Sequence, residues 1–182
     1  MKLFAVRHLP TEWNREGLLQ GIRDLPVSDR LDDETKRRMG ALKKRLESMQ
    51  FDLVLTSALS RARETGRLLG FAPALEPLLN ELDFGPFEGR PKKELVAASG
   101  EAWLTDPLAT PIGEFYRQLE SRIRDFAHGY RDSGTVLAFT HGSWIRAAVA
   151  LAESGSLGTM NSREIQNLDL VELFLDDLAV SN

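Results

Sequence analysis

The chain of 182 residues contains no cysteine, has no excess of positive charge and has no long apolar run. Without cysteine there can be no disulfide, no thiolate metal site and no cysteine nucleophile. A net charge of -4 argues against broad nucleic-acid binding, because contacts to nucleic-acid phosphates normally need a basic face. No apolar stretch approaches the roughly 20 residues that cross a bilayer. We therefore expect no membrane association, no export and a cytoplasmic protein.

The residues that are present are typical of one α/β domain. Hydrophobic residues make up 42% of the chain and charged residues 27%, which is the balance of an ordinary globular protein. The length is sufficient for one domain and short for two. Apolar runs at 3–6, 52–56 and 135–140 alternate with longer segments of helical spacing, which predicts a largely parallel sheet covered by helices. We expect a single domain over 1–182 with a three-layer α/β/α architecture.

Two apolar stripes predict helices that pack against the core. Their residues recur every three or four positions, so they share one face of a helix. Core packing is the preferred interpretation, ahead of contacts to a cofactor. The stripes are Met39, Leu42, Leu46 and Met49 in the segment 33–48, and Phe115, Leu119, Ile123 and Phe126 further along the chain.

Two other segments have a distinct composition. Residues 165–175 are rich in leucine and contain valine and phenylalanine, which predicts one or two further strands before a tail to Asn182. Residues 90–113 contain three prolines and two glycines around a short helical stretch near Trp103. We expect this segment to form a short surface lid.

Basic residues follow three of the predicted strands. Arg7 and His8 come after the first, Arg61 lies in the first turn of the helix after the second, and His141 follows the run 135–140. Carboxyl ends of parallel strands form the ligand-binding edge of α/β sheets. An imidazole can attack phosphorus, and a guanidinium binds phosphate oxygens through two hydrogen bonds. This pattern predicts a phosphate site. The alternatives are an exposed Arg61 with an incidental salt bridge and a buried His141 bonded to backbone.

Two polar residues near these positions have a structural interpretation. Ser57 lies between a strand and a helix, so its hydroxyl is predicted to be the N-cap of that helix rather than a catalytic group. His128 is predicted to lie at a helix C-terminus, where a cation is favoured by the helix dipole.

Four sequence motifs are spread in order over nearly the whole chain. The first is RHLPTEWN at 7–14, followed by Gly17 and by Gln20-Gly21. The others are TSALSRARET at 56–65, LNELDFGPFEG at 79–89 and THG at 140–142. Together they resemble the histidine phosphatase superfamily, the phosphoglycerate mutase-like proteins, whose first motif usually has the sequence RHGETxWN. The resemblance implies a phosphoglycerate mutase-like fold.

The resemblance also implies roles for individual residues. His8 would become a phosphohistidine, while Arg7, Arg61 and His141 would bind and stabilise the phosphoryl oxygens. The chemistry is consistent with this set, because a metal-free phosphoryl transfer needs cationic side chains around the equatorial oxygens. No metal and no other cofactor is implied.

Further residues complete the implied site. Asn14 and Gly142 would contribute to the phosphate pocket, and Glu81 matches the residue that protonates the leaving alcohol. A carboxyl kept protonated by a partly desolvated or anion-rich site is the expected acid. Asp83 and Glu88 lie close by in the sequence and are interpreted as solvated loop charges.

Three positions depart from the family pattern. Leu9 stands where glycine normally follows the nucleophile, so its side chain is expected to crowd the backbone beside the phosphate, although the backbone N–H survives. Leu18 stands where many members have arginine, and Phe115 where many have serine. We expect these two differences to alter the choice of substrate.

A phosphohistidine can return its phosphoryl group to a bound substrate or to water. The mutases of the family that this chain resembles carry longer insertions, which enclose the substrate and shield the intermediate from water. Because the segment 90–113 is compact, hydrolysis is favoured. We expect a phosphomonoester hydrolase for a small metabolite, acting as a monomer or homodimer, and closest in appearance to α-ribazole phosphatases and broad-specificity relatives. The alternatives are a phosphoglycerate mutase and a noncatalytic phosphate-binding or regulatory protein.

Overall fold

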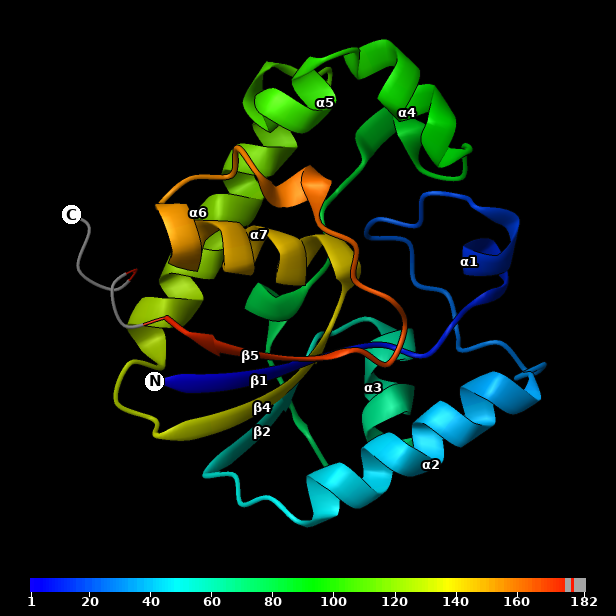
Figure 1. The fold of residues 1–182 in the computed structure, drawn as a ribbon, viewed down its shortest axis with the longest axis vertical. Coiled ribbons are helices and arrows are strands. Elements are labelled where there is room, and N and C mark those ends of the chain that lie inside the picture. Colours follow the sequence, from blue (N-terminus) through cyan, green and yellow to red (C-terminus); the bar gives the residue numbers. More distant parts are fainter. Residues whose placement is uncertain (176–177, 179–182) are drawn as a thin grey trace.

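A five-stranded sheet in the order β3-β2-β4-β1-β5 forms the centre of the molecule (Figure 1). The computed structural model describes residues 1–175 and 178. Neighbouring strands are parallel except β5, which runs antiparallel to β1 at the edge of the sheet. The strands are β1 (Lys2–Arg7), β2 (Leu53–Thr56), β3 (Ala74–Leu75), β4 (Thr135–Thr140) and β5 (Leu170–Phe174). The helices in the described part are α1 (Glu12–Glu16), α2 (Asp33–Glu47), α3 (Ser60–Leu68), α4 (Lys92–Ser99), α5 (Ala102–Thr105), α6 (Gly113–Gly129) and α7 (Gly142–Ser154).

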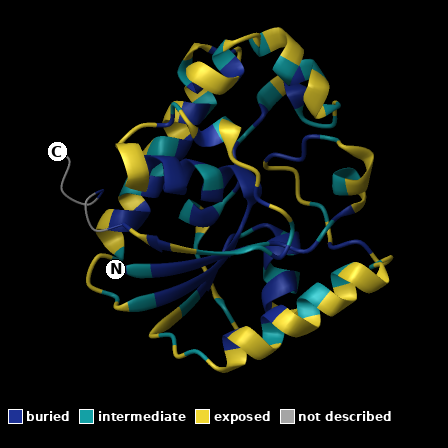
Figure 2. Cartoon of the chain, in the orientation of Figure 1, coloured by how far each residue is buried: buried dark blue, intermediate teal, exposed yellow. Residues whose placement is uncertain are grey.

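The two faces of the sheet are covered by separate cores. Successive side chains of a strand point to opposite faces. Leu3 and Ala5 of β1 accordingly join the core that contains α6 and α7, whereas Phe4 and Val6 join the core that contains α2 and α3. Figure 2 shows the buried strands between two layers of helices, of which α2 is mostly exposed and α7 mostly buried. The predicted three-layer α/β/α architecture is confirmed.

The sequence periodicity predicted most elements closely. The segment 165–175 forms a single strand, β5, and the predicted tail to Asn182 lies outside the described residues apart from residue 178. The short strand β3 was not predicted, because two exposed residues carry no alternating pattern. Both predicted stripes pack into the cores, with Leu42 and Leu46 of α2 on one face and Leu119, Ile123 and Phe126 of α6 on the other.

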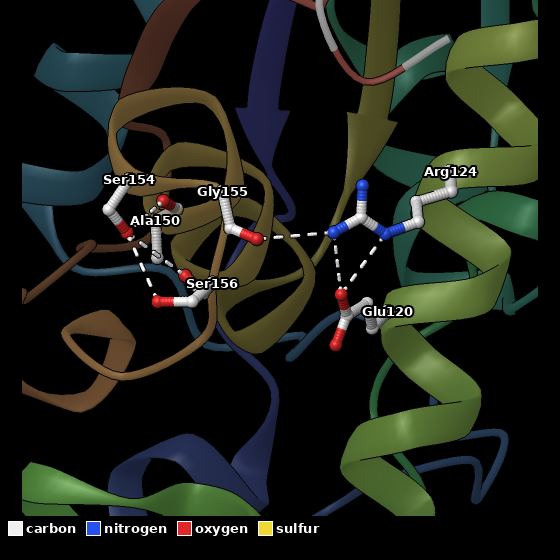
Figure 3. Close-up of polar contacts among 6 residues, drawn as sticks. All are labelled: Glu120, Arg124, Ala150, Ser154, Gly155 and Ser156. Carbon is white, nitrogen blue, oxygen red and sulfur yellow. Dashed lines mark hydrogen bonds and ion pairs between the residues drawn. The ribbon is translucent and has the colours of Figure 1, made fainter. Parts of the chain in front are cut away.

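Polar contacts anchor the C-terminal end of α7 to α6 (Figure 3). The helix ends at Gly155, whose φ of 71° lies in the left-handed region that glycine tolerates. Arg124 of α6 pairs with Glu120 at 2.7 Å and also donates to the Gly155 carbonyl at 3.2 Å. The Ser154 hydroxyl donates to the Ala150 carbonyl at 2.9 Å. The N-terminal end of α7 lies at the carboxyl end of β4, because the helix begins two residues after that strand ends.

The segment 90–113 lies beyond the carboxyl ends of the strands. It contains α4 and α5, which Figure 1 shows apart from the sheet at one end of the molecule. Whether this segment moves as a lid stays a prediction. Among the described residues, none of the helices has the length and apolar character needed to cross a bilayer.

Candidate active site

The predicted basic residues meet at the carboxyl ends of β1, β4 and β2. These strands are parallel neighbours, so the loops that follow them share one edge of the sheet. His8 follows β1, His141 follows β4, and Arg61 lies in the first turn of α3 after β2. The rings of His8 and His141 are 5.2 Å apart between centroids. Residues from three separate motifs are therefore in contact with one another.

His8 is a buried, neutral imidazole with one defined tautomer. Its Nδ1 lies 2.6 Å from the Leu9 carbonyl oxygen, which can only accept, so Nδ1 carries the proton. The lone pair is then on Nε2. Burial, together with the charges of Arg61 and Arg7, lowers the pKa of His8 well below its ordinary value. A buried neutral imidazole with a free nitrogen lone pair is a competent nucleophile.

The ring of His141 is hydrogen-bonded to two side chains, those of Arg61 and Ser57. Arg61 donates from Nε to Nδ1 of His141 at 3.3 Å, so Nε2 carries the proton and donates to the Ser57 hydroxyl at 2.8 Å. Burial, then Arg61 and His8, lower the pKa of His141. The cavity described below is lined by the next residue, Gly142, rather than by His141. Direct binding of phosphoryl oxygens by His141 stays a prediction.

Ser57 is not the helix N-cap that the sequence predicts. Helix α3 begins two residues later than that prediction requires, and its N-cap is Leu59, which makes no side-chain cap. The Ser57 hydroxyl instead accepts the backbone N–H of Leu59 at 3.1 Å and donates to Oδ1 of Asn80 at 2.8 Å. A serine hydroxyl that binds an N–H two residues ahead stabilises the turn before a helix. Its remaining contact is with His141.

Arg61 is fully buried, so the alternative of an exposed side chain is wrong. Its Nη1 and Nη2 donate to the carbonyls of Arg23 and Gly21, each at 2.7 Å. Burial lowers the pKa of Arg61, and Glu81 opposes that shift. The backbone segment 21–23 thus fixes the guanidinium beside His8.

The prediction that Glu88 is a solvated loop charge is also wrong. Its side chain is 8% exposed, and its carboxylate accepts the backbone N–H of Ile22 at 2.7 Å. Gly21 has a φ of 55°, and a side chain there would collide with the Glu88 carboxylate. Burial raises the pKa of Glu88. Glu88 therefore fixes the loop whose carbonyls hold Arg61. Asp83 is half-buried, and among the described residues its carboxylate accepts the nearby Gly85 N–H at 2.6 Å.

The guanidinium group of Arg7 has a hydrogen-bond partner at Nη1 and none among the described residues at Nε. Its Nη1 donates to the Ile165 carbonyl at 2.5 Å, while its buried Nε has no hydrogen-bond partner among the described residues. Burial lowers the pKa of Arg7 to about 10. Gly142 packs against this guanidinium, since a Cβ there would lie 3.3 Å from Nε. The glycine therefore allows the start of α7 to approach Arg7 closely.

Glu81 lies at the N-terminus of α7. One carboxylate oxygen accepts the N–H groups of Trp144 at 3.1 Å and Leu82 at 2.9 Å, and the other accepts that of Ser143 at 3.2 Å. Helix N-termini favour such negative groups. The carboxyl group is therefore oriented by the same helix end that faces Arg7 and His8.

These residues surround a cavity of about 230 Å³. The predicted residues that line it are Arg7, His8, Asn14, Arg61, Glu81 and Gly142. The sequence interpretation missed Ser143, Arg146, Lys92 and Trp103, which also line it. Arg146 could have been found, because it follows Gly142 by four residues and so shares its helix face. No sequence signal marks Lys92 or Trp103, since their place depends on how the segment 90–113 folds back.

The departures from the family pattern have different consequences. The Leu9 side chain is fully buried in the core with α2 and α3, and its N–H donates to Thr65 Oγ1 at 2.8 Å, so the predicted crowding of the phosphate is wrong. Leu18 lines the cavity, whereas Phe115 packs against the core of α6 and α7. Asn14 accepts the Thr11 N–H at 3.1 Å through Oδ1, which leaves its amide N–H groups as donors.

One remaining prediction concerns a histidine outside the cavity. His128 is exposed in the last turn of α6, where the dipole argument placed it. Within the described ranges, no group of three or more histidine, aspartate or glutamate side chains is arranged to hold a metal ion.

Known proteins share both the sequence and the fold of this chain. Residues 3–178 match the Histidine phosphatase superfamily (branch 1). The chain belongs to this superfamily. It is 32% identical over 181 residues to a 2,3-bisphosphoglycerate-dependent phosphoglycerate mutase of Azorhizobium caulinodans, covering 90% of this chain and 86% of that protein. It is 33% identical over 153 residues to the adenosylcobalamin/alpha-ribazole phosphatase of Salmonella typhimurium, covering 78% and 74%.

A solved structure shares the fold of this chain. The crystal structure of TTHB049 from Thermus thermophilus matches with a TM-score of 0.71 and 33% identity, covering 94% of this chain and 92% of that one. The superfamily assignment and the phosphoglycerate mutase-like fold are thus confirmed. Since the relatives are named as mutases and as phosphatases, this superfamily member is an enzyme of one of these two kinds.

Proposed function

We propose that the protein is a cytoplasmic, metal-independent phosphomonoester hydrolase that works through a phosphohistidine on His8. The observation that supports it most is the state of His8, a neutral imidazole whose Nδ1 is bound to Leu9. Its free lone pair lies in a cavity lined by Arg7, Arg61, Lys92 and Arg146, none of which forms an ion pair with a carboxylate of the described residues. A phosphate dianion would neutralise much of this charge.

In the first step, the lone pair on Nε2 of His8 forms a bond to phosphorus, and the bond from phosphorus to the ester oxygen breaks. The leaving oxygen takes a proton from the Glu81 carboxyl group. Arg7 and Arg61 hold the non-bridging oxygens, where negative charge must be stabilised. Glu81 lines the same cavity as Arg7, His8 and Arg61.

In the second step, water attacks the phosphohistidine. The Glu81 carboxylate takes a proton from that water, the bond between Nε2 and phosphorus breaks, and its electron pair returns to His8. Inorganic phosphate leaves, and the enzyme regains a neutral imidazole and a protonated Glu81. The compact segment 90–113 supports hydrolysis, because a short lid leaves the intermediate open to water. A small phosphorylated metabolite fits the cavity, and α-ribazole 5'-phosphate is the first candidate.

A second candidate is a phosphoglycerate mutase. Lys92 and Arg146 line the cavity in addition to the two arginines next to His8, so they could bind the carboxylate of a phosphoglycerate. Burial, with Arg146 and Arg7 close by, lowers the pKa of Lys92, as expected for cations gathered without an acid partner. The mutase of Azorhizobium caulinodans is among the similar proteins.

The proposal is tested by trapping the intermediate. Acid-labile, base-stable phosphate should appear on the wild type during turnover of p-nitrophenyl phosphate, and excess chelator should not lower the rate. His8→Ala should abolish labelling and turnover, whereas His128→Ala, at an exposed histidine, is the matched control. An unchanged rate in His8→Ala would refute the mechanism.

The two reactions and the noncatalytic alternative are separated in parallel assays. Conversion of 3-phosphoglycerate to 2-phosphoglycerate far above phosphate release would identify a mutase. Phosphate release from a panel that includes α-ribazole 5'-phosphate would identify a phosphatase and its substrate. Tight phosphate binding without turnover on the whole panel would support the noncatalytic alternative.

A further inference from the structure

The peptide between His8 and Leu9 is held at both of its polar atoms by side chains from distant segments. Thr65 of α3 accepts the Leu9 N–H through Oγ1 at 2.8 Å. Asn167, in the loop before β5, donates its amide Nδ2 to the His8 carbonyl at 2.7 Å. Because a peptide unit is planar, these two contacts fix its orientation. The carbonyl of Leu9 in turn accepts a hydrogen bond from His8 Nδ1 at 2.6 Å. The orientation of the backbone therefore determines the orientation of the imidazole ring.

Thr65 is itself constrained. Its side chain is fully buried, and its hydroxyl hydrogen is committed to the Arg61 carbonyl at 2.7 Å. The oxygen lone pairs are therefore available to accept the Leu9 N–H. This threonine links the backbone of Arg61 to the backbone after His8.

Asn167 is held in place by a strained neighbour. Leu168 has a φ of 66° and is the one non-glycine residue of the described chain with positive φ. A leucine adopts this left-handed conformation only where its surroundings compel it. The Leu168 side chain is buried in the core with α2 and α3, and its N–H donates to the Arg7 carbonyl at 3.0 Å. This turn of the chain directs the Asn167 amide toward His8.

The same loop is attached on its outer side. Arg38 of α2 pairs with Asp169 at 2.8 Å, and the other oxygen of Asp169 accepts the Gln166 N–H at 2.7 Å. The carbonyl of Ile165 accepts a hydrogen bond from Arg7 Nη1 at 2.5 Å. The loop 165–169 therefore contacts both members of the Arg7-His8 pair.

We propose that Thr65 and Asn167 are positioning residues that hold Nε2 of His8 in line with phosphorus. The inference rests on the proposed function, in which His8 is the nucleophile. Neither residue is among the described residues that line the cavity, so each acts through the peptide and not on the substrate. This clamp also explains how leucine is accepted at position 9, since side chains rather than a glycine determine the backbone there.

The test compares the rate of His8 phosphorylation with phosphate affinity. Thr65→Val keeps the side-chain shape but removes the acceptor, Thr65→Ser restores it, and Asn167→Ala removes the partly exposed donor. We expect Thr65→Val and Asn167→Ala to lower the single-turnover rate of phosphoenzyme formation about 10- to 100-fold, because a small misplacement of a reacting atom has effects of this size. Binding of inorganic phosphate should change less than about twofold, and Thr65→Ser should recover most of the rate. Since both residues hold one peptide, the double variant should lose less than the product of the single losses.

A second readout does not need turnover. In nitrogen NMR spectra of the three histidines, His8 should be the Nδ1–H tautomer in the wild type and a mixture in Thr65→Val and Asn167→Ala. Unchanged phosphorylation rates and an unchanged tautomer in both variants would overturn the clamp. Equal losses of rate, phosphate affinity and thermal stability would also overturn it, because they indicate a purely structural role. If the wild type is never labelled on His8, the proposed function fails, and the tautomer measurement still decides whether the clamp exists.

Discussion

The arginines near the two ends of helix α7 differ in how fully their guanidinium groups are hydrogen-bonded within the protein. At the C-terminal end, Arg124 pairs with Glu120 and donates to the carbonyl of Gly155 (Figure 3). At the N-terminal end, Arg7 and Arg146 each have a buried Nε without a hydrogen-bond partner in the described part of the chain. The first arrangement is complete within the protein, and the second is not.

This difference indicates what the N-terminal end binds. Cations oppose the positive end of a helix dipole, and a buried guanidinium Nε without a hydrogen-bond partner costs stability. Proteins retain such conflicts mainly at functional sites. An anionic ligand would remove the conflict at the start of α7, whereas the end of α7 needs none. The following changes should therefore have large functional effects at one end and small structural effects at the other.

The largest effect is expected for Glu81→Gln at the start of α7. This isosteric change removes the transferable proton, so kcat for an alkyl phosphomonoester should fall about 10²- to 10⁴-fold. For p-nitrophenyl phosphate the loss of the phosphorylation rate should be small, because its leaving group needs no proton. Parallel single-turnover assays on the two substrates provide the measurement. Equal losses on both would show that Glu81 is not the proton donor.

The next effect is expected for Arg61→Lys, which keeps the charge but removes the planar pair of donors. We expect kcat to fall about 10²-fold, because a lysine cannot bind a carbonyl pair and a phosphate with the same geometry. In the wild type, inorganic phosphate at 100 times its Kd should raise the free energy of unfolding by about 2.7 kcal/mol. Thermal unfolding with and without phosphate should show this gain reduced in the variant. An unchanged gain would mean that phosphate binds elsewhere.

A smaller effect is expected from pH. Burial, followed by Arg61, lowers the pKa of both His8 and His141 below the ordinary value of 6.5. As pH falls through 6.5, the unfolded chain takes up protons on these imidazoles before the folded chain does. Stability should therefore be full above that pH and decline below it. Because the pKa of His8 is lowered, Nε2 takes up its proton at a lower pH than an ordinary imidazole does, so the acid limb of kcat/KM in the free enzyme should lie below pH 6.5.

Thermal unfolding and kcat/KM measured from pH 4.5 to 8 test both statements. His128→Gln is the control for the kcat/KM profile, because this histidine is exposed at the end of α6 and is not among the described residues that line the cavity. Stability that rises as the pH falls below 6.5 would contradict the assignment of two neutral buried histidines.

The smallest effect is expected at the other end of α7. Arg124→Leu removes a half-buried ion pair and one hydrogen bond, so the free energy of unfolding should fall by about 0.5 to 1 kcal/mol. Activity should stay within about twofold of the wild type, since the change lies far from the cavity. Denaturant unfolding and steady-state kinetics check this. A large loss of activity would show that the two ends of α7 are coupled.

Much of the site was accessible from the sequence because its residues follow strands. Arg7, His8, Arg61 and His141 were predicted from their places after apolar runs, and parallel strands bring such places together. The role of Leu9 was predicted wrongly, because the sequence does not show toward which core a side chain after a strand end turns. Ser57 was misassigned for a related reason, since two extra residues separate β2 from the helix that it was expected to cap.

The sequence by itself determined most of the strands and helices, the faces that they bury and the set of chemical groups at the strand ends. Those properties are local, because periodicity and strand ends are defined by near neighbours. Only the tertiary structure decided that Arg61 is fixed by backbone carbonyls, that Glu88 fixes those carbonyls, and that Asn167 holds the backbone of His8. Such partners lie far apart along the chain, 159 residues in the last case. Their contacts arise from packing, so no local pattern in the sequence can specify them.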